Sequence, residues 1–301
     1  MTGTHMIGPV LVTGSEGFLG RALIERLRAG GEDVIALDLV PLADRRGWTD
    51  RVTPVAGDIT RPETLDDACA RHGVRAIINL AALIIPACKA NPVLGAQVNI
   101  LGHINAFEAA RRNGIDRIVY TSTIAAKPRP PHDTPVNLYG VYKHCCEEIA
   151  KVYHLDHGIA SVGLRPNVVY GPGRTVGETA FVSAAIAAAA RGEAYQLPFS
   201  GRMCLQHVDE VVDVLVRALH SRPRAAIVSD ITTDTVTMDE LIAAIRAAVP
   251  GADIAASVNL RSAPGNLDNS GLIDLLGDWL RIPLPEGVRR TITGLSRATT
   301  I

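Results

Sequence analysis

The sequence lacks several features that would place it in a specialised class of protein. Its 301 residues carry 30 Lys and Arg against 31 Asp and Glu, so no excess of charge would capture nucleic acid or an anionic membrane. No run of about twenty apolar residues could span a bilayer, and no charged segment followed by an apolar stretch marks secretion. We therefore expect a protein that binds neither nucleic acid nor membranes. Its length allows one large domain, or a domain with a smaller appendage.

Cysteine is also scarce, and its positions lack the paired spacing of a metal site. The five cysteines are Cys69, Cys88, Cys145, Cys146 and Cys204. An odd number of thiols without such spacing fits a reducing compartment. We therefore expect a cytoplasmic protein without a bound metal.

What the sequence does have is a glycine-rich turn near its start. Residues 10–12 are apolar without polar alternation, which is typical of a buried strand. Gly14, Gly17 and Gly20 follow, a pattern that suits a corner where backbone approaches a ligand and a Cβ would be in the way. Apolar residues recur at helical spacing from Phe18, so the glycines lie over a helix N-terminus, which is a favourable site for pyrophosphate.

A second predicted strand, residues 33–38, ends on the carboxylate of Asp38. An acid at this place in a dinucleotide-binding fold accepts hydrogen bonds from the adenosine ribose and repels a 2′-phosphate. This pattern favours NAD over NADP. Arg45 and Arg46 lie downstream and could pair with a 2′-phosphate, which leaves NADP as the alternative.

Strands continue to alternate with helices through the first half of the chain. The predicted strands cover 51–56, 75–80 and 117–121, and the predicted helices cover 63–72 and 91–113. This order predicts an α/β protein with a doubly wound, Rossmann-type parallel sheet that binds ligands beyond the carboxyl ends of its strands. We expect an NAD-binding domain over 8–172 that carries the catalytic residues. Residues 173–301 are expected to form a smaller mixed α/β substrate-binding portion, interleaved with the last strands of the sheet.

A tyrosine and a lysine share one face of a predicted helix that starts near Asn137. Tyr139 and Lys143 are four residues apart, whereas Tyr142 is rotated by about a hundred degrees from Lys143. Tyr139 is therefore the partner of the lysine. An ammonium nearby, together with an oxidised nicotinamide, would lower the pKa of the phenol towards a range useful for proton transfer. A row of hydroxyls, residues 121–123, ends the strand before this helix.

Together these motifs resemble the extended short-chain dehydrogenase/reductases, the NAD-dependent epimerase/dehydratase family, and the resemblance covers nearly the whole chain. The segments that carry it are Thr13-Gly14-x-x-Gly17-Phe18-Leu19-Gly20, Asp38, Gly57-Asp58, Asn79-Leu80-Ala81-Ala82, Ser122-Thr123, Tyr139-x-x-x-Lys143 and Arg165-Pro166-x-x-Val169-Tyr170-Gly171-Pro172. The resemblance implies that Tyr139 is the acid/base and that Lys143 holds the nicotinamide ribose. It also implies that Thr123 hydrogen-bonds the reacting substrate oxygen, and that Asn99 supports the active site through its helix.

The expected cofactor site combines the glycine turn with the strand ends and the catalytic helix. Its residues are Gly14, Glu16, Gly17, Phe18, Leu19, Gly20, Asp38, Asp58, Ile59, Leu80, Ala81, Ala82, Asn99, Tyr139, Lys143, Pro166 and Val168. For Asp58 two roles are open: it either accepts from the adenine amino group, with Ile59 packed on the ring, or caps the turn before the next helix.

The chain departs from the family at two places that bear on the reaction. Dehydratases of the family carry Asp-Glu directly after the active-site Thr, and here Ile124 and Ala125 follow it, which disfavours dehydration. Nucleotide-sugar enzymes of the family place a diphosphate-binding Arg where this chain has 203–205, and Arg202 lies one place early. A one-residue shift turns a strand side chain to the opposite face. The candidate substrate residues are Thr123, Asn167, Arg174, Arg202 and Arg261, and Arg174 and Arg261 are either anion ligands or solvated loop residues.

The resemblance implies an NAD-dependent enzyme that transfers a hydride at a secondary alcohol or ketone carbon of a sugar-like small molecule. The family's usual chemistry favours an epimerase. The missing Arg favours the alternative, a dehydrogenase of a small polyol, sugar acid, or hydroxy or amino acid, and segments 122–126 and 263–270 are similar to such family members. A non-catalytic NAD-binding protein is a further alternative. We expect a homodimer, because the helices that begin near 91 and 139 carry apolar positions beyond one face.

Overall fold

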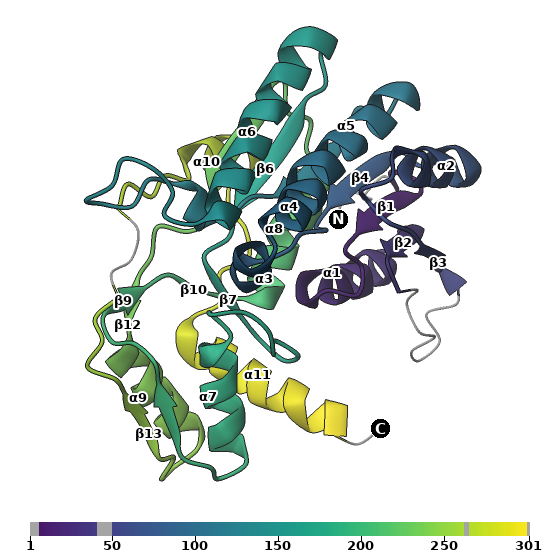
Figure 1. The fold of residues 1–301 in the computed structure, drawn as a ribbon. Helices are drawn as coiled ribbons and strands as arrows, with labels where there is room; N and C mark the ends of the chain where they lie inside the picture. Colours follow the sequence, from purple (N-terminus) through teal and green to yellow (C-terminus); the bar gives the residue numbers. More distant parts are fainter. Residues whose placement is uncertain (1–5, 41–49, 262–264, 300–301) are drawn as a thin grey trace.

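A seven-stranded parallel sheet forms the larger part of the molecule (Figure 1). The computed structural model describes residues 6–40, 50–261 and 265–299. The sheet order is β3-β2-β1-β4-β5-β6-β11. The strands are β1 (Val10–Thr13), β2 (Val34–Asp38), β3 (Val52–Ala56), β4 (Ala76–Asn79), β5 (Ile118–Thr121), β6 (Ser161–Arg165) and β11 (Ala226–Asp230). The order reverses between β1 and β4, so the predicted doubly wound, Rossmann-type sheet is confirmed.

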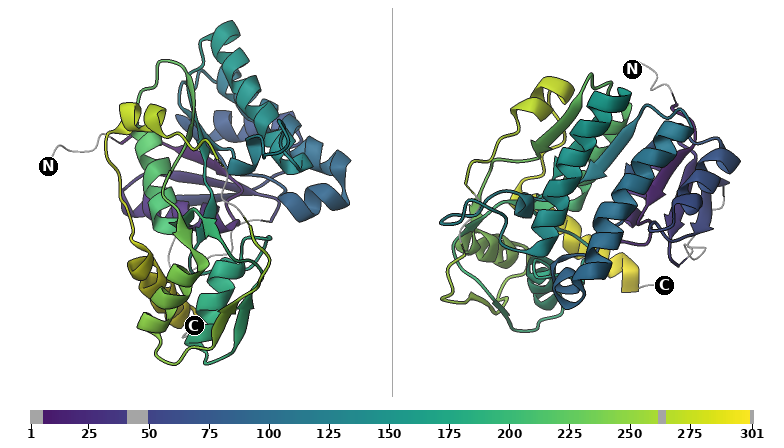
Figure 2. Two further views of the ribbon diagram at one scale, coloured as in Figure 1. Left: turned by 90° about the vertical axis from the view of Figure 1, so that its left-hand side faces the viewer. Right: turned by 45° about the horizontal axis from the view of Figure 1, so that its top comes forward.

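Helices cover both faces of this sheet (Figure 2). Strand β1 has apolar side chains on both faces of the sheet. Val10 and Val12 pack in one apolar core, and Leu11 packs in another on the opposite face. One face carries α1 (Phe18–Ala29), α8 (Val208–His220) and α10 (Ser270–Leu276), and the other carries α2 (Pro62–His72), α5 (Gly102–Arg112) and α6 (Leu138–His157). With both faces buried, strands without polar alternation are expected, as the sequence shows.

The helix predicted over 91–113 is present, because α4 (Pro92–Ala96), a π-helical turn η2 (Gln97–Leu101) and α5 follow one another without a gap. A separate short helix, α3 (Ile85–Ala90), precedes it and was not predicted. Pro86 and Pro92 lie in the first turns of α3 and α4, where proline is tolerated because its missing N–H has no helical partner. The Asn91 side chain accepts a hydrogen bond from the Leu94 N–H at 3.1 Å and caps α4. Helical periodicity in the sequence could not reveal the π-helical turn within this helix.

The smaller portion of the molecule lies beyond the carboxyl edge of the sheet (Figures 1 and 2). Short strand pairs build it, joined by α7 (Phe181–Ala190), α9 (Met238–Ala248) and α11 (Leu284–Thr299) around a third apolar core. The pairs are β7 (Val168–Tyr170) with β10 (Leu205–His207), β9 (Arg202–Met203) with β12 (Val236–Thr237), and β8 (Tyr195–Leu197) with β13 (Ile254–Ala256). Between these segments of the smaller portion, the chain contributes α8 and β11 to the main sheet and its helical layer. The division at residue 172 remains a prediction.

No helix within the described ranges is long and apolar enough to cross a membrane.

Candidate active site

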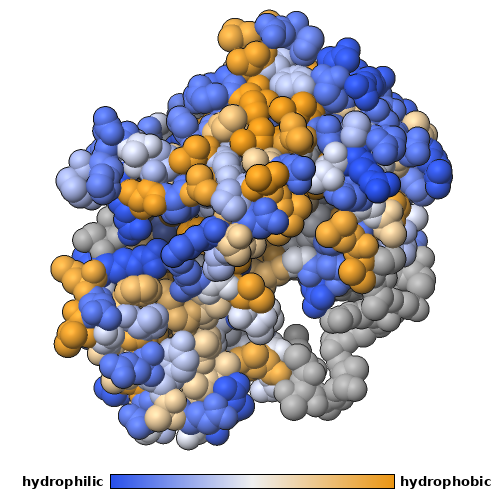
Figure 3. Space-filling view, in the orientation of Figure 1, coloured by the Kyte–Doolittle hydropathy of each residue, from blue (hydrophilic) through white to orange (hydrophobic). Residues whose placement is uncertain are grey.

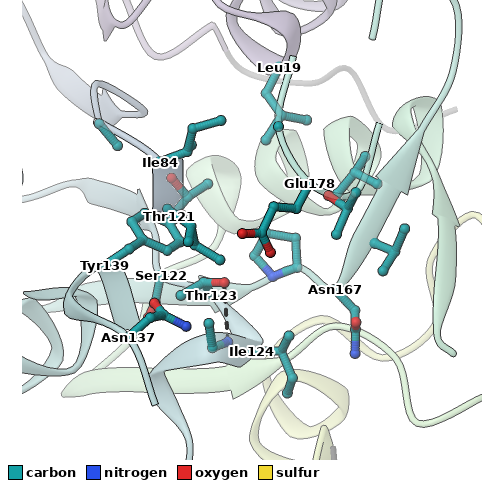
Figure 4. Close-up of a pocket in the computed structure, with 18 of the residues that line it drawn as sticks. Leu19, Ile84, Thr121, Ser122, Thr123, Ile124, Asn137, Tyr139, Asn167 and Glu178 are labelled. Carbon is teal, nitrogen blue, oxygen red and sulfur yellow. Dashed lines mark hydrogen bonds between the residues drawn. The ribbon is translucent and has the colours of Figure 1, made fainter. Parts of the chain in front are cut away.

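A cavity of about 300 Å³ lies at the carboxyl edge of the sheet, where loops of the smaller portion face it (Figure 4). The glycine turn and the end of β4 form one part of its wall, and the end of β5 and the start of α6 form another. Segments 166–169 and 174–179, with Met203 and Arg261, complete it. This is the edge at which doubly wound sheets bind their ligands.

The glycine turn is packed against the loop after β4. Gly14 has φ +68°, and a Cβ on it would lie 2.8 Å from the Ala81 backbone nitrogen, so only glycine fits there. A Cβ on Gly20 would meet the Gly14 carbonyl. Helix α1 starts at Phe18 without a side-chain cap on its first N–H groups, which leaves them available to an anion. The predicted residues Gly14, Gly17, Phe18, Leu19 and Gly20 all line the cavity.

Asp38 lies at the end of β2 and is tied to this turn. Its carboxylate accepts hydrogen bonds from the Glu16 N–H at 2.9 Å and from the Leu39 N–H at 2.8 Å. Each oxygen retains a lone pair for a ribose hydroxyl. The protein therefore fits an adenosine ribose at the position that the sequence indicates. Arg45 and Arg46, the residues of the NADP alternative, lie outside the described residues.

A buried hydrogen-bond chain holds the ends of β1 and β4 at one level. The Thr13 hydroxyl donates to the Asn79 side-chain oxygen at 2.6 Å and accepts from the Ala81 N–H at 3.2 Å. This places Leu80 and Ala82 on the cavity wall, with the backbone of Ala81 against the glycine turn.

Asp58 and Ile59 do not line the cavity. One Asp58 carboxylate oxygen accepts from the Thr60 N–H at 2.9 Å and from its hydroxyl at 2.8 Å, which closes a turn before α2. The structure thus provides the turn-forming role for Asp58. Ile59 is buried in the core, and a Cβ on Gly102 of α5 would lie 2.9 Å from its side chain. Little of Ile59 is left to pack on a base, and its contact with adenine stays a prediction.

Tyr139 and Thr123 both line the cavity, whereas Lys143 is not among the described residues that line it. The Asn137 side chain caps α6 by accepting from the Gly140 N–H at 2.8 Å, and Tyr139 lies in the first turn beside Thr123 (Figure 4). Lys143 is buried one turn further on, and its ammonium donates to the Thr121 carbonyl at 2.7 Å. The Tyr142 hydroxyl instead donates to the Pro92 carbonyl at 3.0 Å, away from the cavity.

The acidity of Tyr139 differs from the sequence expectation. Burial raises the pKa of its phenol to about 12, and this outweighs the lowering by a hydrogen bond from Thr123 and by the charge of Arg174. Burial also lowers the pKa of the Lys143 ammonium. The sequence predicted that Lys143 and an oxidised nicotinamide would together lower the pKa of the Tyr139 phenol. The protein's own groups do not lower it. The cation that acts on Tyr139 is Arg174, which is a finding the helical spacing could not predict.

Asn99 lies in the π-helical turn, outside the cavity wall. Its side-chain amide donates to the Gly95 carbonyl at 2.9 Å and to the Leu83 carbonyl at 3.0 Å. Its backbone carbonyl accepts from the Cys146 thiol of α6 at 3.1 Å. Asn99 thus connects η2 to the loop before α3 and to the helix of Tyr139. Its catalytic and cofactor roles remain predictions.

A buried charge network, which sequence reasoning missed, lies next to the candidate catalytic residues. Glu147 follows Lys143 by one turn of α6, and its carboxylate accepts a hydrogen bond from the Ser122 hydroxyl. It also accepts two hydrogen bonds from the Arg165 guanidinium, at 2.7 and 2.6 Å. Arg165 is 3.7 Å from Asp230, which accepts from Lys127 at 2.8 Å. The spacing of Glu147 from Lys143 on one helix face was an available signal.

The substrate candidates separate into two groups. Thr123, Asn167, Arg174 and Arg261 line the cavity. Arg202 does not: its guanidinium donates to the hydroxyl and the carbonyl of Thr235, both at 3.0 Å, while Met203 lines the wall. Placing Arg202 at the substrate is therefore wrong, because adjacent strand residues point to opposite faces.

The cavity also contains residues that the sequence did not single out. Lys127, Arg129 and Glu178 line it, together with an apolar wall of Ile84, Ile85, Pro86 and Val136. The loop before α6 thus covers the cavity through Arg129 and Val136. In the described part of the chain no cluster of three or more His, Cys, Asp or Glu could hold a metal ion.

Comparisons with known proteins agree with this geometry. The model of a family described as the NAD dependent epimerase/dehydratase family matches residues 10–228. The UDP-glucose 4-epimerase of Mycolicibacterium smegmatis is 29% identical over 94% of this chain and 96% of that protein. The one of Rhizobium meliloti (strain 1021) is 33% identical over 52% of this chain, which spans 50% of that protein.

For several further curated relatives the chain also spans about half of their length. Among solved structures, "MoeE5 in complex with UDP-glucuronic acid and NAD" is 27% identical, with a TM-score of 0.82 over 97% of this chain and 100% of that one.

Proposed function

This chain belongs to the NAD-dependent epimerase/dehydratase family, and on that premise we propose that it is a UDP-sugar 4-epimerase. The family is NAD-dependent, and the glycine turn with Asp38 fits that cofactor. The observation that carries the proposal is the placement of Tyr139 and Thr123 in one cavity with Arg174 and Arg261. Such a cavity offers proton transfer at one end and two cations for a diphosphate.

In the proposed reaction Tyr139 takes the proton of the sugar 4-hydroxyl while Thr123 hydrogen-bonds the same oxygen. The glycine turn and Asp38 would hold NAD, which would supply a reversible hydride acceptor for C4, so that the configuration could be inverted without net consumption of the cofactor. Tyr139 then returns the proton to the oxygen of the intermediate ketone. Lys143 fixes the end of β5 through the Thr121 carbonyl and lies one turn from Tyr139, where it would meet the nicotinamide ribose.

The anionic part of the substrate is supported by two arginines. Arg174 has its guanidinium carbon 5.4 Å from the centre of the Phe18 ring and donates to Thr179 at 3.3 Å, and its Nε is buried without a partner among the described residues. Arg261 lies 4.9 Å from the centre of the Phe199 ring. These ring contacts orient both guanidinium groups, and a buried unsatisfied N–H favours an incoming anion.

The experiment that tests the proposal is incubation of the protein with NAD and UDP-glucose. Proton NMR would follow formation of UDP-galactose, and absorbance would follow NADH. Isomer formation without NADH is the expected result. Accumulation of NADH with a small polyol, sugar acid or threonine would instead show a dehydrogenase, the function that Met203 at the usual arginine position favours. No product with any substrate, while NAD binds, would leave the non-catalytic alternative.

We also propose a homodimer in the cytoplasm. Val141, Val152 and Leu155 form an exposed stripe along α6, with exposed Leu94 and Leu101 on the neighbouring α4 and η2. Figure 3 shows hydrophobic side chains gathered over these helices. A stripe of this kind on two adjacent helices favours pairing with a second copy of itself. The cytoplasmic location is supported by the five cysteines, none of which forms a disulfide in the described part of the chain.

A further inference from the structure

One acidic side chain, that of Glu178, reaches into the cavity. It lies on the loop between β7 and α7, and Figure 4 shows its carboxylate pointing into the space that Thr123 and Tyr139 border. Of the described residues that line the cavity, it is the single acid, against Lys127, Arg129, Arg174 and Arg261.

Glu178 differs from the other acids near the site in having no bonded partner. Asp230 and Glu147 are both buried and bonded to cations. Glu178 makes no hydrogen bond or salt bridge with any residue that the structure describes, although its charge acts on Arg261. The loop itself is held in place, because Ala180 donates to the Gly177 carbonyl at 3.0 Å and Arg174 donates to Thr179 at 3.3 Å. The structure thus holds an exposed carboxylate, without a bonded partner among the described residues, on the wall of the cavity that Thr123 and Tyr139 also line.

The chemistry of that group restricts the sugar. A carboxylate accepts hydrogen bonds from sugar hydroxyls, and a charged acceptor makes stronger bonds than a neutral one. The same charge repels a second carboxylate that enters the cavity, and such repulsion can reject one substrate in favour of another. Arg261, on which the charge of Glu178 acts, would otherwise attract such a substrate acid. Glu178 offsets that attraction.

We propose that Glu178 selects a neutral, hydroxyl-bearing sugar and excludes sugars that carry a carboxylate. This inference rests on the proposed function, since it assigns the sugar half of the same substrate. The fold itself accepts an acidic sugar in a relative, because MoeE5 is in complex with UDP-glucuronic acid. The discrimination in this chain therefore lies in the side chains of the pocket.

The test is binding of UDP-glucose and UDP-glucuronic acid to the NAD-loaded protein, measured by isothermal titration calorimetry. These two ligands differ only in a hydroxymethyl against a carboxylate group. We expect the wild type to prefer UDP-glucose by at least about tenfold, and Glu178→Gln to reduce this preference about tenfold, mainly by tighter binding of UDP-glucuronic acid. Glu193→Gln is the matched control, because Glu193 is an exposed glutamate that pairs with Arg191 outside the cavity.

The outcomes separate the inference from the function on which it rests. Binding of both nucleotide sugars with the same ratio in wild type and Glu178→Gln would overturn the inference alone. A wild type that binds neither would overturn the proposed function and the inference together. An equal change in the Glu193→Gln control would show that the ratio follows overall charge, and would also overturn the inference.

Discussion

At the scale of single residues, burial sets the chemistry of this site more strongly than nearby charge does. Tyr139 has a raised pKa although a cation acts on it, and Lys143 has a lowered one. Both shifts favour the neutral form, because removing a charged group from water costs more than one partner restores. In the proposed reaction, a bound cofactor and substrate would therefore supply part of the electric field in which Tyr139 exchanges its proton.

Tyr139→Phe removes the proposed acid/base and leaves the ring. We expect kcat to fall by about two to four orders of magnitude, since general acid/base catalysis contributes that much. Binding of NAD should change little, because the glycine turn and Asp38 are untouched. The matched control is Tyr142→Phe, whose hydroxyl bonds to Pro92 outside the cavity. Wild-type turnover by Tyr139→Phe, measured by NMR, would contradict the assignment.

His103 makes stability depend on pH. Its buried ring packs on Phe107 and Tyr120, and burial, with the charge of Lys143, lowers its pKa to about 3. In the unfolded chain the ordinary value is about 6.5, so below that pH the unfolded state binds a proton that the folded state refuses. Stability is therefore fully present above about pH 6.5 and falls as the solution becomes more acidic.

As the pH falls from 6.5 to 5, we expect the low pKa of His103 to reduce the free energy of unfolding by about 2 kcal/mol. Urea unfolding of wild type and His103→Gln across that range would measure it. The free energy of unfolding of the variant should depend less steeply on pH. Some dependence should remain, because burial also lowers the pKa values of His207 and His220. Parallel slopes in the two proteins would refute the prediction.

At the scale of secondary-structure elements, the catalytic helix is held by its buried charges as well as by packing. Glu147 of α6 bonds to Ser122 at the end of β5 and to Arg165 at the end of β6. Lys143, one turn earlier, bonds to the Thr121 carbonyl. Two adjacent turns of α6 are thus fixed to the strand end that carries Thr123.

Glu147→Gln removes the carboxylate that Arg165 binds with two hydrogen bonds and leaves Asp230, 3.7 Å away, beside the guanidinium. Breaking a buried ion pair costs about 3–5 kcal/mol when the partner's charge is left alone, and because Asp230 offsets part of that charge we expect a loss of about 3 kcal/mol in the free energy of unfolding. Glu148→Gln is the control on the next residue, where an exposed carboxylate pairs with Lys151 and should contribute less than about 1 kcal/mol. Equal effects of the two substitutions in urea unfolding would show that the Glu147 pair has no special role.

At the scale of the whole molecule, the active site depends on chain segments that are far apart in sequence. Lys127 pairs with Asp230 and donates to the Asn266 carbonyl, while Asp230 accepts from the Asp268 N–H at 2.7 Å. The loop after β5 is thereby joined to the end of β11 and to the segment that follows Arg261. Both portions of the molecule contribute to the cavity wall.

The proposed dimer is a property of this scale. Leu155 is 79% exposed on α6, and Leu155→Lys would place a charge in the stripe of apolar residues. We expect a dimeric wild type and a monomeric variant at micromolar concentration by light scattering, since burying an unpaired ammonium opposes association. Val258→Lys is the control, because Val258 is 95% exposed on a loop outside the stripe. A monomeric wild type would overturn the proposal.

Much of this protein follows from local pattern. The alternation of apolar runs with amphipathic helices indicated the doubly wound sheet, since a strand buried on both faces needs no polar alternation. The tight turn at Gly14 could be predicted, because a positive φ and a close backbone contact admit no residue other than glycine. The position of Tyr139 and Lys143 on one face of α6 could be predicted, because helical spacing alone determines it.

Other features arise only when distant segments meet. Helical periodicity in the sequence could not show the π-helical turn at Asn99. The roles of Arg174, Glu178 and Asp230 depend on loops that fold back over the sheet edge. The orientation of Arg202 away from the cavity depends on strand pairing with β12. The charge and shape of the substrate pocket are long-range properties, because each wall comes from a different part of the chain and no local spacing records their distances.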